Sequence, residues 1–195
     1  DIGEFDTLRG DPESARVYER SNSAAFAAIR DAPFPTLASI AGICFGGGCG
    51  LAAACDLRIA SDDAVFAVPA GRLGLAYPAD AMPDLVHALG QQTARYMTYS
   101  GARIDAARAL ASGFLLEVVA LQDLQRRTDD IAGAIAAAAP LSVRASKAAI
   151  RSVLTGDAGD RVAAARLGDL TFDSADYAEG RRAFKERRTP HFSGR

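Results

Sequence analysis

The sequence predicts one α/β domain that is followed by a helical C-terminal extension. Three observations support this fold class. The run from Thr36 to Cys55 carries no charge, and three consecutive glycines interrupt it at residues 46–48. Short apolar stretches follow this run, whereas the chain from Pro78 onward carries mostly helical patterns that end near glycines. With 195 residues and 49% hydrophobic content, the chain has enough apolar material for one substantial core.

The first part of the chain is predicted to alternate between helices and buried strands. Residues 12–30 have apolar residues at helical spacing, and the prolines of the following "DAPFPT" end that helix. The stretch "TLASIAGICF", residues 36–45, is expected to form one buried strand. Residues 49–55 after the glycines are rich in helix-forming alanine, and residues 57–60 and 64–68 are expected to be short strands.

The second part of the chain is predicted to be mainly helical. Three helical segments between residues 80 and 113 each end near a glycine, and residues 114–121 form a strand or a buried connector. From Gln122 to Arg188 the pattern indicates several helices, with breaks at the Ala139–Pro140 pair and in "TGDAGD".

The composition excludes several classes of function. The net charge of −2 leaves no basic excess for binding nucleic acid or an anionic membrane. The three cysteines form no CxxC pair and the two histidines lie far apart, so we expect no metal site. The uncharged run is long enough to span a membrane, but its central glycines favour a turn between two buried elements. The opening "DIGEFDTLRG" does not resemble a signal peptide, and we therefore expect a cytoplasmic protein.

The glycines at residues 46–48 lie between a predicted strand and a predicted helix. Such a junction directs backbone N–H groups into a pocket, and the positive end of the helix favours negative charge there. The sequence lacks the GK[ST] ending of a phosphate-binding loop, and no GxGxxG frame of a dinucleotide site fits it. Two interpretations stay open on the residues alone: an oxyanion-binding turn, or glycines that permit close packing of helix and strand.

Four stretches carry the pattern of a known family: "ASIAGICFGGGCGLAAACDLRIASDDAVFAVPAGRLGLAYP", "TYSGARIDAARALASGFLLEVV", "APLSVRASKAAI" and "FDSADYAEGRRAFKERRTPHFSGR". They resemble the crotonase (enoyl-CoA hydratase/isomerase) superfamily and span nearly the whole chain. The resemblance implies a spiral core of ββα units over residues 1–120. It also implies a helical region over residues 121–195 that forms trimers, often paired into hexamers, and contacts coenzyme A.

The resemblance also implies a chemistry for the glycine turn. In this family two backbone N–H groups bind a thioester carbonyl and stabilise the enolate that the reaction forms. One donor corresponds to Gly47. The other belongs to a turn that precedes the stretch similar to "DIGEF", so we expect part of the core to lie before Asp1. Asp1 and Ile2 are then expected to contact coenzyme A.

The sequence departs from the hydratases of this family at two positions. The two glutamates that hydratases use to hold and activate water correspond to Gly50 and Ala70. Neither glycine nor alanine can transfer a proton, so we expect ordinary hydration of a double bond to be impaired.

Two residues of the loop after Gly74 are candidates for the remaining chemistry. Asp80 resembles the acidic residue of isomerase-like members, although the alternative is a cap for the helix that begins near Ala81. Tyr77 resembles a tyrosine of the methylmalonyl-CoA decarboxylases, although the alternative is a core aromatic residue whose hydroxyl is satisfied.

The C-terminal stretch gathers cations around one aromatic residue. The residues are Arg181, Arg182, Phe184, Lys185, Arg187 and Arg188. An aromatic ring among guanidinium groups suits the adenine and the phosphates of coenzyme A. The resemblance implies that Phe184 and Arg187 contact the nucleotide, while the alternative is a solvated basic surface.

The sequence thus predicts an acyl-CoA-processing enzyme of the hydratase/isomerase type, with Gly47, Asp80 and Tyr77 in its site. We expect no cofactor other than the coenzyme A of the substrate. Two alternatives stay open: a decarboxylase of malonyl-type thioesters, which needs mainly an oxyanion site and a dry pocket, and a non-catalytic acyl-CoA-binding protein.

Overall fold

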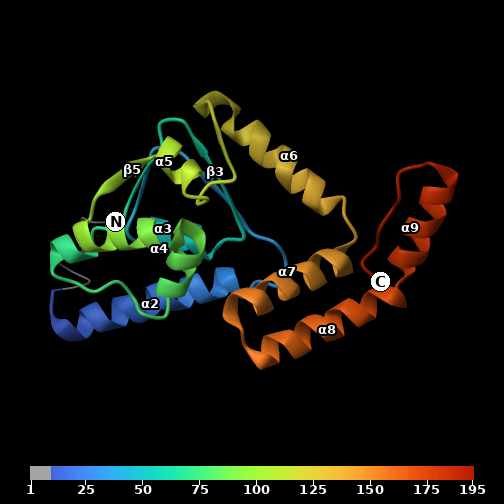
Figure 1. Cartoon of the computed structure of the whole chain (residues 1–195), viewed down its shortest axis with the longest axis horizontal. Helices are drawn as coiled ribbons and strands as arrows, with labels where there is room; N and C mark the ends of the chain where they lie inside the picture. The colour runs from blue at the N-terminus through green and yellow to red at the C-terminus, as the bar shows by residue number, and fades with distance from the viewer. Residues whose placement is uncertain (1–9) are drawn as a thin grey trace. The chain divides into compact units, whose positions relative to one another are not determined.

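A computed structural model describes residues 10–195, which form two compact units (Figure 1). The first unit contains the described chain up to Ala32 and residues 36–125. The second unit contains residues 33–35 and 126–195.

Helix α2 (Pro12–Arg30) opens the first unit and confirms the helix predicted over residues 12–30. Asp11 caps it, since its Oδ1 accepts hydrogen bonds from the N–H groups of Glu13 at 2.8 Å and Ser14 at 3.0 Å. The Ser14 hydroxyl accepts one in return from the Asp11 N–H at 3.3 Å, which completes a capping box. A cap of this kind stabilises a helix by about 0.5–2 kcal/mol.

The single strand predicted over residues 36–45 is wrong. The structure has two strands here, β1 (Leu37–Ile40) and β2 (Ile43–Phe45), and they belong to different sheets. Gly42 lies between them with φ of 63°, a left-handed conformation that favours glycine and redirects the chain. Periodicity could not reveal this break, because both strands are apolar.

Two small sheets result from this change of direction. In the first, β1 pairs in parallel with β3 (Leu57–Ser61), which pairs in parallel with β6 (Glu117–Val119). In the second, β2 pairs in parallel with β4 (Val65–Ala67), and β4 pairs antiparallel with β5 (Arg103–Asp105). Strands β1 to β4 thus alternate between the two sheets, whereas the consecutive strands β4 and β5 are neighbours in the second sheet.

Besides α2, the first unit contains further helical segments. They are α3 (Gly47–Ala54), α4 (Met82–Ser100), α5 (Ala106–Ala111), and the 3-10 turns η2 (Ala70–Leu73) and η3 (Leu121–Asp123). Gly90 interrupts α4 with φ of 71° and ψ of 158°, so α4 contains the two helical segments that the sequence predicted. Helix α3 contacts both α2 and α4.

The core of the first unit lies between these strands and helices. Phe66 of β4 and Phe114 after α5 meet edge to face with ring centroids 5.3 Å apart, and both are buried. Leu85, Leu89 and Met97 of α4 are buried in the same cluster. Each such side chain contributes roughly 1.5–3 kcal/mol on burial, so this cluster fixes the strands that carry the site.

The second unit is helical. Helix α6 (Leu124–Ala136) leads into it, followed by α7 (Pro140–Thr155), α8 (Ala158–Phe172) and α9 (Ala175–Glu186). Helices α7 and α8 pack along each other as a hairpin (Figure 1). No helix within residues 10–195 has the length and apolar character needed to cross a membrane.

Large apolar side chains of α7 and α8 are exposed in the single chain. Val153 is 81% exposed, Val162 71% and Phe172 67%. Each would lose contact with water in an assembly that covers this hairpin.

Candidate active site

The glycine turn joins β2 to α3. Gly46 has φ of 52° and ψ of −113°, a conformation that residues with a side chain rarely adopt. Its N–H donates to the Ala67 carbonyl at 2.9 Å, which fixes the turn to β4. The first helical hydrogen bond runs from the Gly50 N–H to the Gly46 carbonyl at 3.1 Å.

The first N–H groups of α3 therefore have no acceptor within the helix. Gly47 is the first residue of α3, so the helix leaves its N–H without a partner inside the helix. A Cβ atom built on Gly47 would meet no described atom within 4 Å. The helix dipole favours negative charge on an oxygen that binds this N–H.

Arg58 binds the opposite end of α3. It belongs to the stretch "CDLRIA", and sequence analysis assigned it no role. Its guanidinium donates to the carbonyl oxygens of Cys55 at 2.6 Å, Ala52 at 3.2 Å and Phe114 at 2.6 Å. Burial lowers the pKa of Arg58 somewhat, but a guanidinium stays charged at neutral pH. A cation at the C-terminus stabilises the helix and holds α3 in place.

Two buried cysteines flank the glycine turn. The Cys49 thiol donates to the Cys44 carbonyl at 2.8 Å. The adjacent Cys44 thiol and burial together raise the pKa of Cys49. A protonated thiol is a poor nucleophile, and the buried Cys49 side chain packs against the turn.

The space beside Gly50 is filled by two aromatic side chains. A Cβ atom on Gly50 would lie 2.5 Å from the Phe26 ring and 2.7 Å from the Tyr77 hydroxyl oxygen. Phe26 of α2 is only 3% exposed, so its ring is held firmly at this point. A glutamate at position 50 would require both aromatic residues to move. Gly50 is thus part of a packed arrangement, which sequence reasoning could not show.

The Tyr77 hydroxyl is buried and forms no hydrogen bond with any residue in the described part of the chain. Burial is the main cause that raises the pKa of Tyr77 well above its ordinary value, followed by the nearby Cys49 and Asp84 groups. Tyr77 therefore stays protonated and can donate a hydrogen bond. The alternative of a core aromatic residue holds for the ring, which packs against the core, whereas no described residue satisfies the hydroxyl.

Asp80 lies at the surface. It is exposed, and its Oδ1 accepts a hydrogen bond from the Ser23 hydroxyl at 3.1 Å. The capping alternative is wrong, because α4 begins at Met82 with Ala81 as its N-cap residue.

A second carboxylate, Asp84, was not singled out from the sequence. Its side chain is 12% exposed and forms an ion pair with Arg30 of α2 at 2.6 Å. Burial raises the pKa of Asp84, and Arg30 opposes that shift. The pair joins the end of α2 to the start of α4, near Tyr77. Only the tertiary contact between these helices could have revealed it.

Ala70 is half-buried at the first position of η2. Its carbonyl oxygen accepts a hydrogen bond from the Leu75 N–H at 3.0 Å, which closes the loop that leads to Tyr77. Its methyl side chain offers no group for proton transfer. Asp1 and Ile2, expected to contact coenzyme A, lie outside the described residues.

The cationic C-terminal stretch divides into two parts. Helix α9 ends at Glu186, so Arg187 and Arg188 lie beyond it. Arg182 and Arg188 form ion pairs with Glu179. Phe184, in contrast, is 86% exposed, and Arg187 is exposed too. The five cations of this stretch therefore do not share one helix, since Arg187 and Arg188 follow the end of α9. They are not equivalent either, because Arg182 and Arg188 are bound within the chain.

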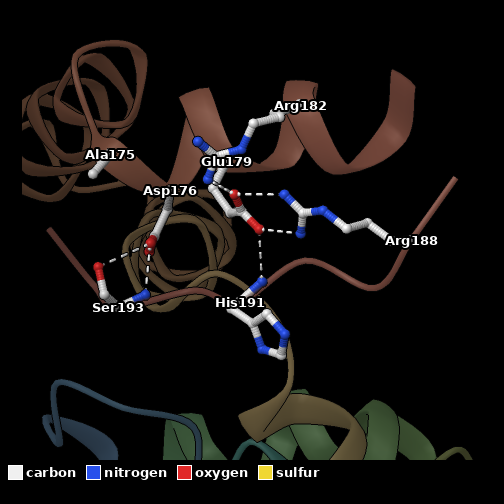
Figure 2. Close-up of a pocket in the computed structure, with 7 residues that line it drawn as sticks. All are labelled: Ala175, Asp176, Glu179, Arg182, Arg188, His191 and Ser193. Carbon is white, nitrogen blue, oxygen red and sulfur yellow. Dashed lines mark hydrogen bonds and ion pairs between the residues drawn. The ribbon is translucent and has the colours of Figure 1, made fainter. Parts of the chain in front are cut away.

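An open pocket of about 440 Å³ lies between α9 and the chain that follows it (Figure 2). It is lined by Ala175, Asp176, Glu179, Arg182, Arg188, His191 and Ser193. Asp176 accepts hydrogen bonds from the N–H groups of Ser193 at 2.6 Å and Gly194 at 2.8 Å. The two acidic residues of α9 thus fix the last residues of the chain.

A family model for enoyl-CoA hydratase/isomerase matches residues 3–195. The chain belongs to this family. YngF from Bacillus subtilis bears the name of an enoyl-CoA hydratase/isomerase. It is 36% identical to this chain over 184 residues, which cover 93% of this chain and 69% of YngF. The carnitinyl-CoA dehydratase of Proteus mirabilis is 34% identical over 166 residues, covering 83% of this chain and 64% of that relative. These matches confirm the family resemblance.

A solved structure supports the fold of this family member. The enoyl-CoA hydratase/isomerase family protein from Hyphomonas neptunium has a TM-score of 0.93 and 35% identity, over 100% of this chain and 74% of that chain. The α/β fold with a helical C-terminal region is thereby confirmed. The chain spans 69% and 63% of the length of the first two curated relatives that it matches.

The packing at Gly50 generates a stability prediction. Gly50→Ala should lower the free energy of unfolding by about 1–3 kcal/mol, because its methyl group would overlap Phe26 and Tyr77. Gly48→Ala in the same helix is the matched control, since its Cβ would lie 3.7 Å from the nearest atom, the Cys44 sulfur. Its stability should be unchanged or slightly higher. Denaturant unfolding measures both, and equal effects of the two changes would contradict this packing.

Proposed function

We propose that this family member processes acyl-CoA thioesters through an enolate whose oxygen is bound by the Gly47 N–H. The place of this amide at the positive end of α3, where it has no partner within the helix, supports the proposal. A hydrogen-bond donor that points to the developing oxyanion lowers a reaction barrier by about 2.7–4 kcal/mol. Membership of the family supports the same substrate class.

Hydration of a double bond is the reaction of the family that this site supports least. Water addition needs acid and base groups held on one water molecule. Position 50 is packed by Phe26 and Tyr77, and position 70 is an alanine. The packing of aromatic residues at Gly50 is the observation that carries this conclusion.

Two reactions through an enolate remain. In isomerisation a base removes a proton from one carbon and returns it to another, and Asp80 is the candidate base. In decarboxylation the bond between the α-carbon and the carboxylate breaks, its electron pair enters the enolate, and carbon dioxide leaves before the α-carbon takes a proton. The buried, protonated Tyr77 favours decarboxylation, since it can orient a carboxylate but cannot act as a base.

Gly46→Ala tests the oxyanion site. A side chain at this conformation should strain the turn and misdirect the Gly47 N–H, and kcat/KM should fall about 10²–10³-fold for whichever thioester is turned over. Gly113→Ala is the control, because Gly113 also has a positive φ of 82° but lies after α5. The substrate panel contains crotonyl-CoA, a 3-enoyl-CoA and methylmalonyl-CoA. If the wild-type protein turned over none of them, the non-catalytic binding alternative would replace the enolate proposal.

Substitution of Tyr77 and Asp80 separates the two reactions. Tyr77→Phe should reduce carbon dioxide release from methylmalonyl-CoA about 10-fold or more, without loss of stability, because it removes an unpaired buried hydroxyl. Asp80→Asn should leave that release unchanged. The reverse pattern, with isomerisation abolished by Asp80→Asn alone, would identify an isomerase.

Contact with coenzyme A through Phe184 and Arg187 is part of the same proposal. Both side chains are exposed, and an aromatic ring and a guanidinium suit the base and the phosphate of a nucleotide. Arg187→Ala should weaken acetyl-CoA binding by about 1.5–3 kcal/mol in calorimetry. Arg166→Ala, an exposed arginine of α8, is the control and should leave the affinity unchanged.

We also propose that the chain assembles into trimers, which pair into hexamers. The exposed Val153 and Val162 of the α7 and α8 hairpin support this assembly. Light scattering should give a trimer or a hexamer for the wild-type protein, and Val153→Asp should shift it to smaller species. A wild-type monomer would contradict this proposal.

A further inference from the structure

Arg187 has an unusual backbone conformation. Within residues 10–195 it is the only non-glycine residue with a positive φ, at φ of 53° and ψ of 42°. The left-handed region is unfavourable for any residue with a Cβ atom. Such residues persist where the surrounding structure fixes them, and they often mark functional positions.

The contacts of the next residue fix this conformation. The Arg188 guanidinium contacts both carboxylate oxygens of Glu179, with its two terminal nitrogens 2.6 Å from Oε1 and 3.1 Å from Oε2. Its Nε donates to Glu186 at 2.6 Å. Its backbone N–H donates to the Ala183 carbonyl at 3.1 Å, which closes the end of α9.

Glu179 is the centre of this group of contacts (Figure 2). It is 8% exposed, and it also accepts hydrogen bonds from Arg182 and from the His191 N–H at 3.1 Å. These donors hold the pKa of Glu179 well below its ordinary value, so the carboxylate stays ionised. Glu179 therefore binds the chain on both sides of the turn that contains Arg187.

We propose that Glu179 is a positioning residue that acts through Arg188 to hold Arg187 ready for a coenzyme A phosphate. The inference rests on the proposed contact of Arg187 with coenzyme A. Arg188 is bound by Glu179 and is not available to a ligand. Arg187, one residue earlier, forms no ion pair with any described residue. The fixed backbone then sets the direction in which the Arg187 side chain leaves the turn, which reduces the ordering that ligand binding requires.

The sign of one substitution separates positioning from a purely electrostatic role. Glu179→Gln removes a negative charge and releases Arg182 and Arg188. If Glu179 acted only through its charge, an anionic ligand would then bind more tightly. If Glu179 positions Arg187, the ligand should bind more weakly.

Calorimetry with acetyl-CoA on the full-length protein makes this test. Glu179→Gln should weaken binding about 10-fold, which corresponds to about 1.4 kcal/mol. In an Arg187→Ala background the same change should have no further effect, because the positioned group is gone. Unchanged or tighter binding by Glu179→Gln, or additive losses in the double variant, would overturn the proposal.

Asp176→Asn is the matched control. Asp176 is a buried carboxylate on the same helix, but in the described part of the chain it binds Ser193 and Gly194 and forms no hydrogen bond or ion pair with Arg188. Acetyl-CoA affinity should stay within about two-fold of wild type.

Arg188→Lys serves as a second test if Glu179→Gln does not fold, since lysine keeps the charge but cannot form the bidentate contact with Glu179. It should weaken binding too, and unchanged affinity would overturn the proposal.

Thermal unfolding gives a readout that needs no ligand. Arg187→Gly should raise Tm by about 2–4 °C, because glycine adopts the left-handed conformation without strain. In the Glu179→Gln background this gain should vanish, because Arg187 can then relax. An equal gain in both backgrounds would show that Glu179 does not hold Arg187. Failure of the wild-type protein to bind acetyl-CoA would instead remove the proposed function, and with it the role for Arg187.

Discussion

The backbone conformation of Gly46 is the constraint on which the candidate site depends. It allows the chain to leave β2, donate a hydrogen bond to the Ala67 carbonyl of β4, and begin α3 at the next residue. Because the turn is fixed to a strand, the direction of α3 and of its free N–H groups is fixed too. Arg58 binds the other end of the helix through the Ala52 and Cys55 carbonyls. The helix dipole is thereby held in one orientation relative to the sheet.

The small residues of α3 permit the packing that distinguishes this site. Gly50 has no side chain, and the Phe26 ring and the Tyr77 hydroxyl lie where its Cβ would be. A position that could hold an acid is thus apolar, with one protonated hydroxyl at its edge. This packing supports the proposal that the site stabilises an enolate and does not activate water.

The C-terminal unit uses buried carboxylates for a different purpose. Asp176 and Glu179 are satisfied by backbone N–H groups and guanidinium groups of the residues that follow α9. They order a segment that has little apolar material of its own. As a result the cations of this stretch are not equivalent, since Arg188 belongs to the internal structure whereas Arg187 is exposed.

The sequence by itself determined the family, the glycine turn and most helices, because these depend on local patterns: capping residues, glycine positions and apolar spacing. It also determined that positions 50 and 70 have no acid. Only the tertiary structure decided that residues 36–45 form two strands in separate sheets, since the apolar pattern is the same for one strand or two. The tertiary structure also decided the environments of Tyr77, Asp84 and Arg188. Each of these side chains depends on a neighbour distant in sequence or on the turn after α9. Burial and charge pairing arise from packed neighbours, and residue spacing along the chain does not encode them.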